Sequence, residues 1–175
     1  MSDGSQTFPH APRMTRRLAV RRSPIHGSGV FALRDLAAGE SLLEYRGRRL
    51  THAEADERYG DNHYGGHTFL FTLNEHYVID GADGGNAARW INHSCAPNCQ
   101  AFLIESREPG TEKDRVVLEA LHDIRAGEEL TYDYGIVLEV RQTAKLRQIW
   151  ACRCGSPGCT GTLLKPRRPK RTAAA

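Results

Sequence analysis

The five cysteines of the chain lie in two short stretches that are far apart in the sequence. Residues 89–99 read RWINHSCAPNC, and residues 150–159 read WACRCGSPGC. The second stretch places Cys152, Cys154 and Cys159 around a turn rich in Gly and Pro. Short spacing on a turn lets three sulfurs converge on one ion, and zinc prefers four ligands in a tetrahedron at about 2.3 Å. This triplet therefore predicts a metal site that needs one more ligand.

The fourth ligand must come from the other stretch, where Cys95, Cys99 and His93 are the candidates. Five thiols are one too many for a tetrahedral site and cannot all pair in disulfides within the chain. The first residues lack the apolar segment of a secretory signal, so we expect a reducing compartment, in which cysteines more often bind metal than form disulfides. Spacing alone leaves the choice among the three candidates open.

Two segments of the chain resemble each other, and each leads into a strand that carries tyrosine. The segments RDLAAGESLLEY (34–45) and HDIRAGEELTYDY (122–134) share Asp, an aliphatic residue and Ala-Gly-Glu. Gly39 and Gly127 stand where a tight entry to a strand needs a positive φ, so a reused turn explains the repeat. The tyrosines that follow these turns are Tyr45, Tyr132 and Tyr134.

The elements that would position these residues are short strands separated by turn signals, not long amphipathic helices. Thr51 and Glu54 form a capping box for one helix, and Gly60 stands where its C-terminal cap would be. The segment 136–149 is a second helical candidate. Two hairpins are expected, one from TFLFTL and YVID and one from CQAFLIES and RVVLEAL. The predicted strands are 17–22, 30–33, 40–47, 68–73, 77–80, 99–106 and 115–121.

The composition fits one domain with polar ends. The chain has 175 residues, of which 39% are hydrophobic, and its formal net charge is +3. Residues 1–15 are polar and aperiodic, and residues 165–175 form a basic tail, so we expect both ends to be disordered. The tail could hold an acidic partner or make weak contact with nucleic acid, although a solubilising end explains it as well. No run approaches membrane-spanning length, so no membrane partner is expected.

Three strings, in the order in which they occur, resemble the SET-domain protein lysine methyltransferases with a C-terminal post-SET zinc segment. They are GNAARWINHSCAPNC, GEELTYDYG and CRCGSPGCTG, and weaker matches are HGSGVFA, EYRG and YVIDG. The resemblance implies a mainly β, β-clip-like fold, with short strands in small sheets around a pseudoknot and few short helices. It divides the chain into a SET domain (16–135), a connector (136–150) and a post-SET zinc segment (151–164), between the two tails.

The resemblance also assigns a metal and a cofactor. The expected Zn²⁺ ligands are Cys95, Cys152, Cys154 and Cys159, which leaves Cys99 as a small buried hydrophobe. S-adenosylmethionine is the expected methyl donor. Its expected contacts are His26, Gly27, Ser28, Gly29, His67, Arg89, Asn92, His93 and Tyr134. The family commonly has Lys and Trp where this chain has His26 and Ser28, so at these two positions the expectation rests on backbone contacts.

Tyr134 matches the family's catalytic tyrosine, and Tyr45 and Tyr132 would line the channel for the substrate lysine. A lysine amine with a reference pKa of about 10.4 must lose its proton before it attacks, and desolvation beside a cation lowers that pKa. No carboxylate base is then required, and aligning the reacting groups remains the task of the site. In the family, Tyr at position 132 tends to restrict the product. We therefore expect mono- or dimethylation of a histone or histone-like protein.

Two other classes of function remain open. One is a catalytically silent SET module that binds a chromatin-like partner or nucleic acid; loss of Tyr134 or of the Asn92–His93 pair would mark it, and neither is lost. The other is a small zinc-binding nucleic-acid domain, which would retain DNA without binding S-adenosylmethionine. The expected location is cytoplasmic, or nuclear and chromatin-associated, and not the secretory pathway. For a bacterial source, it is the cytoplasm or a host nucleus.

Overall fold

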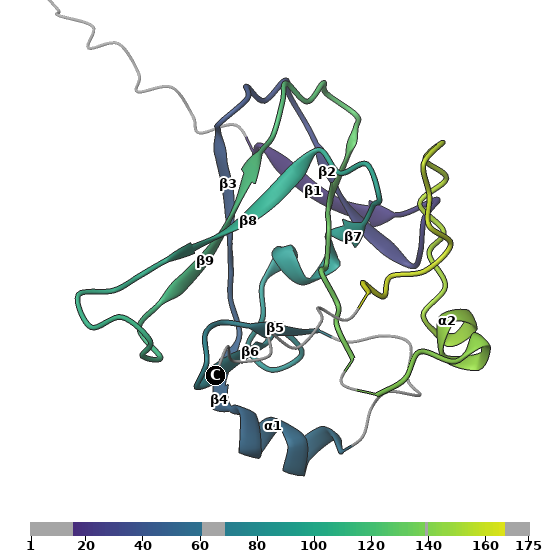
Figure 1. Cartoon of the computed structure of the whole chain (residues 1–175). Helices are drawn as coiled ribbons and strands as arrows, with labels where there is room; N and C mark the ends of the chain where they lie inside the picture. The colour runs from purple at the N-terminus through teal and green to yellow at the C-terminus, as the bar shows by residue number, and fades with distance from the viewer. Residues whose placement is uncertain (1–15, 61–68, 139, 167–175) are drawn as a thin grey trace, which may run out of the picture.

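A computed structural model describes residues 16–60, 69–138 and 140–166, and these ranges contain three small β-sheets with few and short helices (Figure 1). The first sheet has the strand order β1 (Leu18–Arg22), β2 (Ser28–Ala32), β10 (Glu129–Tyr132), β7 (Asn92–His93). The second has the order β3 (Ser41–Tyr45), β9 (Arg115–Ala120), β8 (Cys99–Ile104). The third has the order β4 (Arg48–Thr51), β6 (Tyr77–Asp80), β5 (Leu70–Thr72). The helices are α1 (His52–Tyr59), the 3₁₀ turn η2 (Ala87–Trp90) and α2 (Ala144–Ile149). The predicted mainly β fold is confirmed.

The local predictions hold where the sequence carried specific turn and cap signals. Thr51 and Glu54 form the capping box at the start of α1, with the Thr51 backbone N–H donating to Glu54 Oε2 over 2.7 Å. Gly60 ends the helix with a φ of 56°, a value that favours glycine. Both predicted hairpins are present, because β5 pairs with β6 and β8 pairs with β9, each antiparallel.

The two similar segments of the sequence pair with each other in space. Leu36 and Ile124 form an isolated antiparallel bridge, and both side chains are fully buried. The aspartate of each segment accepts a hydrogen bond from a backbone N–H of the other segment. Gly39 and Gly127 have φ values of 77° and 92°, which confirms the turn prediction. The repeat thus joins the entry to β3 to the entry to β10, the two strands that carry the tyrosines.

A parallel strand pair brings the Asn-His motif beside the tyrosine motif. In this pair β7 lies against β10, with Asn92 opposite Thr131 and His93 opposite Tyr132. The side chain of Asn98 reinforces it, because its Nδ2 donates to the Glu129 carbonyl over 2.8 Å and its Oδ1 accepts from the Thr131 N–H over 2.8 Å. Strands that are sequentially distant are therefore held in one register at the centre of the molecule.

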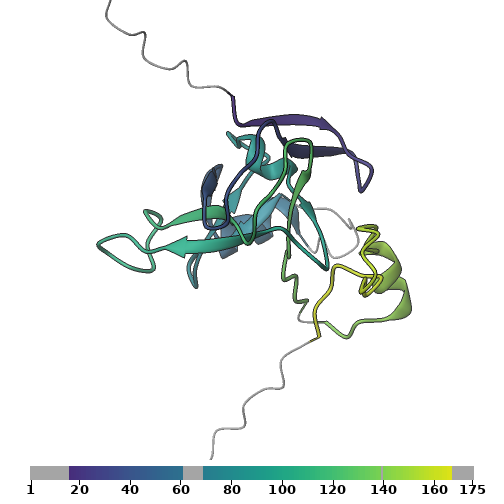
Figure 2. The same cartoon turned by 90° about the horizontal axis from the view of Figure 1, so that it is seen from above.

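Residues 136–166 form a small unit beside the sheets, as Figure 2 shows for α2 and the chain end that follows it. Its own apolar cluster consists of Leu138, Leu146, Trp150 and Leu164. The helix predicted over 136–149 is shorter than expected. It spans only Ala144–Ile149, because Thr143 caps the start by accepting a hydrogen bond from the Leu146 N–H, and Ile136 pairs instead with Leu164 in a parallel bridge. None of the helices within the described ranges has the length and apolar character to cross a lipid bilayer.

Candidate active site and metal centre

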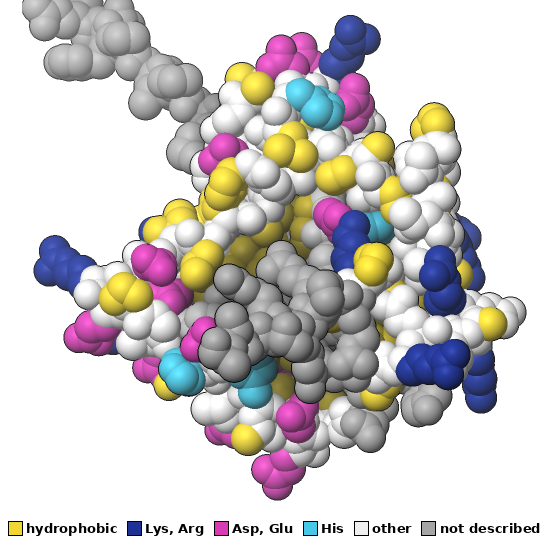
Figure 3. Space-filling model, in the orientation of Figure 1, with side chains coloured by type: hydrophobic (Ala, Val, Ile, Leu, Met, Phe, Trp, Pro, Cys, Tyr) yellow, Lys and Arg dark blue, Asp and Glu magenta, His cyan; other side chains and the backbone are white. Residues whose placement is uncertain are grey.

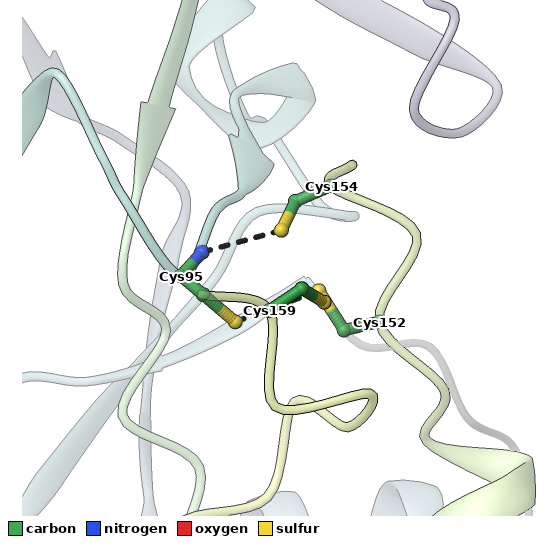
Figure 4. A group of neighbouring side chains, drawn as sticks. All are labelled: Cys95, Cys152, Cys154 and Cys159. Atoms are coloured by element: carbon green, nitrogen blue, oxygen red, sulfur yellow. Dashed lines mark hydrogen bonds between the residues drawn. The ribbon is translucent and has the colours of Figure 1, made fainter. Parts of the chain in front are cut away.

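The structure gathers four of the five cysteines into one cluster (Figure 4). The sulfurs of Cys95, Cys152, Cys154 and Cys159 all lie within 4.8 Å of one another, and the Cys95 and Cys152 sulfurs are 3.8 Å apart. Four sulfurs at about 2.3 Å from one zinc ion would be separated by about 3.8 Å along each tetrahedral edge. The cluster could therefore hold a metal ion with little rearrangement, and it would tie residues 152–159 to the strand pair at the centre.

The thiol of Cys154 is prepared for metal binding by its neighbours. Burial alone would raise its pKa, but the Cys95 backbone N–H at 3.5 Å and the Ser156 hydroxyl at 3.2 Å stabilise the thiolate and lower the pKa to about 5. A metal ligand must be deprotonated, so this thiol meets the requirement at neutral pH. Cys99 is the opposite case, since it is fully buried in the main core and burial raises its pKa to about 12.

His93 connects the cysteine cluster to the tyrosine motif. Its Nδ1 accepts a hydrogen bond from the Tyr134 backbone N–H over 3.1 Å, and its Nε2 lies 3.5 Å from the Cys95 sulfur. An Nδ1 that accepts must be unprotonated, so a neutral His93 carries its proton on Nε2, facing the sulfur. Burial lowers the pKa of His93 and favours this neutral form. The candidate metal site thus consists of the four cysteines, and His93 lies beside it.

The side chain of Asn92 is held by acceptors on three sides. Its Nδ2 donates to the His26 carbonyl at 3.2 Å, to the Ser28 carbonyl at 2.9 Å and to Glu129 Oε1 at 2.8 Å. This arrangement fixes the orientation of the amide, and within the described ranges Oδ1 has no hydrogen-bond partner. The side-chain oxygen Oδ1 of Asn92 is therefore available to accept a hydrogen bond from a ligand. Gly27 lies between His26 and Ser28, whose carbonyls accept these bonds, and its φ of 50° favours glycine.

Glu129 organises the loop that leads to Gly29, and the sequence analysis gave it no role. Its two carboxylate oxygens each lie 2.8 Å from the Ser23 hydroxyl, which also accepts from the backbone N–H groups of Ile25 and His26. A Cβ on Gly29 would lie 2.2 Å from Glu129 Oε1, so only glycine permits this approach. A side chain at position 29 would therefore displace the Glu129 carboxylate from its present contacts. The string GEELTYDYG contains Glu129, but nothing in its spacing distinguishes it from exposed Glu128.

We expect Glu129→Ala to lower the free energy of unfolding by about 2 kcal/mol, because hydrogen bonds to a charged group contribute about 1.5–3 kcal/mol each and partners are left unsatisfied. Urea denaturation followed by circular dichroism measures this. The matched control is Glu128→Ala, an exposed neighbour whose change we expect to stay within about 0.5 kcal/mol. Equal effects of the two variants would contradict the role given to Glu129.

Tyr134 lines two cavities. The smaller one, about 250 Å³, mixes polar and apolar walls. It is lined by Ile25, His26, Asn92, His93, Tyr134, Gln148, Ile149, Ala151, Arg153 and Leu163. The larger one, about 520 Å³, also has both polar and apolar walls, and its aromatic residues include Tyr45, Phe71, Tyr132, Tyr134 and Trp150. Of the described residues that line them, Tyr134 is the one shared by both.

The aromatic rings of the larger cavity form a connected row. The ring centroids of Tyr132 and Tyr134 are 4.8 Å apart, those of Phe71 and Tyr132 are 6.1 Å apart, and those of Tyr45 and Phe71 are 5.2 Å apart. Burial raises the pKa of all three tyrosines above the ordinary value, so each stays a neutral phenol. Tyr134 donates its hydroxyl hydrogen to the Ile91 carbonyl over 2.9 Å, which fixes the ring at the boundary between the cavities.

Arg89 lies on the wall of the larger cavity and not among the residues of the smaller one. Its guanidinium stacks 4.6 Å from the Trp90 ring centroid and donates to the Gly81 carbonyl over 3.1 Å. Its Nε is buried without a hydrogen-bond partner within the described ranges. Arg89 therefore braces the aromatic wall and retains one unused donor. His67, the remaining expected contact, lies outside the described residues.

Several cavity residues were not found by sequence reasoning. Gln148, Ile149 and Arg153 complete the smaller cavity from α2 and from residues 151–164, which we call the cysteine segment, and Phe71 completes the larger one. The sequence indicated a helix over 136–149 followed by a turn that carries cysteines, but not which part of the protein these residues contact. The aromatic character of Phe71 was visible, whereas its direction on a three-residue strand was not.

Comparisons with known proteins agree with this arrangement. A family model described as the SET domain matches residues 27–135. A protein of Candida albicans named "Histone-lysine N-methyltransferase, H3 lysine-4 specific" is 40% identical over 146 residues, which are 81% of this chain and 13% of that protein. Proteins of the same name from Saccharomyces cerevisiae and Mycosarcoma maydis are 41% and 38% identical, over 81% and 82% of this chain. The chain spans only 13% and 9% of the length of these two relatives.

Proposed function

The chain belongs to the SET domain family, and on that premise we propose that it is an S-adenosylmethionine-dependent protein-lysine N-methyltransferase acting on a histone or histone-like basic protein. The names of its relatives specify lysine 4 of histone H3. The observation that carries the proposal is that Tyr134 lines two separate cavities, the larger of which contains a row of aromatic rings. Such an arrangement suits a methyl transfer in which donor and acceptor enter through different cavities.

The smaller cavity fits the methyl donor. His26, Asn92, Gln148 and Arg153 offer polar contacts, and Ile25, Ile149 and Leu163 offer an apolar surface. This combination suits a ligand with a charged amino-acid end and a flat purine, and the free Oδ1 of Asn92 can accept from an ammonium group. When bound, S-adenosylmethionine supplies a methyl group on a positively charged sulfur. The chain's own residues then have to hold the lysine amine in line with that methyl group and exclude water.

The larger cavity fits a lysine side chain. Its aromatic walls suit the aliphatic stem and the cationic end of lysine. Only about one lysine amine in a thousand is uncharged near pH 7.4 at its reference pKa of about 10.4. Desolvation of the ammonium group, next to the positive charge that a bound donor would carry, would lower its pKa, so the proton can leave to solvent before transfer. The neutral phenols of Tyr45, Tyr132 and Tyr134 can orient the amine but cannot act as phenolate bases, which agrees with the raised pKa of each.

The charge around the larger cavity favours a basic substrate. Asp56 lines it from α1, is exposed, and has no ion pair with another described residue. Residues 1–135 carry twenty Asp and Glu against fifteen Lys and Arg, so the body that contains the cavity is negative. A lysine-rich histone segment is complementary to this surface. We accordingly propose a nuclear, chromatin-associated site of action.

The cysteine cluster fits Zn²⁺ as a structural ion. Four thiolates are a common ligand set for structural zinc, and the sulfur spacing matches a tetrahedral site. The cluster would fasten residues 151–164 against the body, which completes the smaller cavity through Ala151, Arg153 and Leu163. Zinc would therefore serve the donor site through the fold, without contact with the reacting atoms.

The proposal is tested by incubating the purified chain with tritiated S-adenosylmethionine and mixed core histones. We expect label on a histone lysine, mapped by mass spectrometry, and loss of label with Tyr134→Phe. A silent binding module would bind histone without transferring label, and a zinc-dependent nucleic-acid domain would not bind the donor. Either result, obtained with protein that contains zinc and is folded, would overturn the proposal.

Tyr132 is expected to limit the number of methyl groups transferred. Its ring is buried in the channel, and its hydroxyl has no hydrogen-bond partner among the described residues, so it can hold a water molecule there. A water occupies about 30 Å³, close to the volume of a methyl group. We expect the native protein to give mono- and dimethyl-lysine, and Tyr132→Phe to give trimethyl-lysine as the main product. Mass spectrometry of a methylated peptide measures both, and main trimethylation by the native protein would contradict this role.

A further inference from the structure

The charges of the chain are segregated along the sequence. Residues 1–135 have twenty acidic and fifteen basic side chains, whereas residues 136–175 have one acidic and nine basic side chains. The net charge of the first part is therefore −5 and that of the second is +8, which together give the +3 of the whole chain. The small net charge of the whole chain thus results from two parts whose net charges have opposite signs.

Part of this positive charge lies on a folded surface. Arg141 precedes α2, and Lys145 and Arg147 lie on α2; all three side chains are exposed. We call this group the α2 basic surface. In Figure 3, Lys and Arg gather over α2 and the cysteine segment, while Asp and Glu are distributed over the top, left and bottom of the view. The apolar cluster around Trp150 lies within residues 136–166, so the surface belongs to a packed unit.

The arginines of this surface differ from several of those on the body in lacking carboxylate partners. Arg17 and Arg34 both pair with Glu40, and Arg58 pairs with Asp83. Arg141 and Arg147 have no ion pair with any described residue, and no acidic residue is described between 136 and 166. Their charge is therefore not neutralised by an ion pair with any of the residues that the structure describes.

We propose that the α2 basic surface binds the phosphate backbone of double-stranded DNA. Guanidinium groups match phosphate oxygens, and DNA presents a negative charge for about every 1.7 Å of its axis. Trp150, the aromatic residue of this part, is 4% exposed, so the surface offers no aromatic anchor of the kind that dominates protein–protein interfaces. Nor does it offer an exposed ring for stacking a base. The contact is with the backbone and does not depend on base sequence.

The opposite charge of the body makes this contact directional. A body with a net charge of −5 is repelled by phosphate, so the α2 side faces the duplex and the acidic side faces away. The interaction is independent of methyl transfer, since it would remain in a chain that cannot transfer a methyl group. It would hold the chain near any DNA-bound basic protein.

The proposal is tested by fluorescence anisotropy of the full chain with a labelled duplex of about 20 base pairs. For about four phosphate contacts we expect the affinity to fall about 100-fold between about 50 and 200 mM salt. The test variant is Arg141→Gln with Arg147→Gln, and the matched control is Arg21→Gln with Arg22→Gln. All four side chains are exposed, neither pair lines a cavity, and each variant removes two positive charges.

We expect the test variant to bind DNA at least about 10-fold more weakly and to show a salt slope reduced by about two, whereas the control changes less than about twofold. Equal losses in the two variants would show an effect of net charge alone and would overturn the proposal. So would displacement of the duplex by poly-glutamate, or tighter binding of single-stranded RNA of the same length. Label transfer to a short lysine peptide should be unchanged in both variants, so failure here is distinct from failure of the proposed activity.

Discussion

Cys159→Ala is expected to abolish binding of the proposed zinc ion and to lower methyl transfer by at least about 100-fold, because a cavity wall displaced by about 1 Å can reduce a rate by that factor. Three sulfurs would remain for an ion that prefers four ligands. The binding of structural zinc contributes on the order of 10 kcal/mol to folding at neutral pH, whereas residues 136–166 have only a small apolar cluster of their own. The cysteine segment would therefore detach and leave the smaller cavity open.

The chain supplies its own matched control in the fifth cysteine. Cys99 is fully buried in the main core, away from the cluster, so Cys99→Ala should keep one zinc per chain and most of the activity. Metal content by mass spectrometry, label transfer and urea denaturation are measured on both variants. The core of the sheets does not include the cysteine segment, so Cys159→Ala should keep a cooperative unfolding transition. Full activity of Cys159→Ala without metal would refute the structural role of the cluster.

Tyr134→Phe is expected to lower kcat by about 10²–10³, the range seen when one preorganised hydrogen-bonding group is removed from an active site. The hydroxyl donates to the Ile91 carbonyl, and in the proposed reaction its oxygen faces the lysine amine. Removing it leaves the ring, so both cavities keep their walls. The donor's dissociation constant, measured by calorimetry, should change less than about threefold, because the loss concerns alignment and not donor binding.

Tyr132→Phe is the comparison for this prediction, since it removes the same group from the adjacent ring, 4.8 Å away. We expect it to stay active and to change the product, whereas Tyr134→Phe should be nearly inactive toward every methylation state. Single-turnover rates with unmodified and monomethylated peptide separate the two. Comparable activity of the two variants would remove Tyr134 from the catalytic role.

The sequence predicted much of the local structure because its signals act over a few residues. The capping box at Thr51 and Glu54, the positive φ at Gly39 and Gly127, and the two antiparallel hairpins each depend on neighbouring residues. The motif strings also identified the family, because matching short sequence strings to a family requires no information about contacts in the fold. The predicted helix over 136–149 was too long at its N-terminal end. The sequence pattern did not indicate that the helix begins only after Thr143, its N-cap.

What the sequence determined by itself was a set of residues able to bind metal, donor and lysine. The tertiary structure decided which of these residues lie close to one another. Spacing left Cys95, Cys99 and His93 open as the fourth ligand, and only the resemblance to the family favoured Cys95. In the structure the sulfur of Cys95 lies with those of the triplet, Cys99 is buried on β8 in the main core, and His93 on β7 accepts a hydrogen bond from the Tyr134 N–H. Glu129 acquired a role in the same way, through contacts with Ser23 and Asn92. The physical reason is that contacts between residues tens of positions apart depend on the packing of whole strands, which no local pattern encodes.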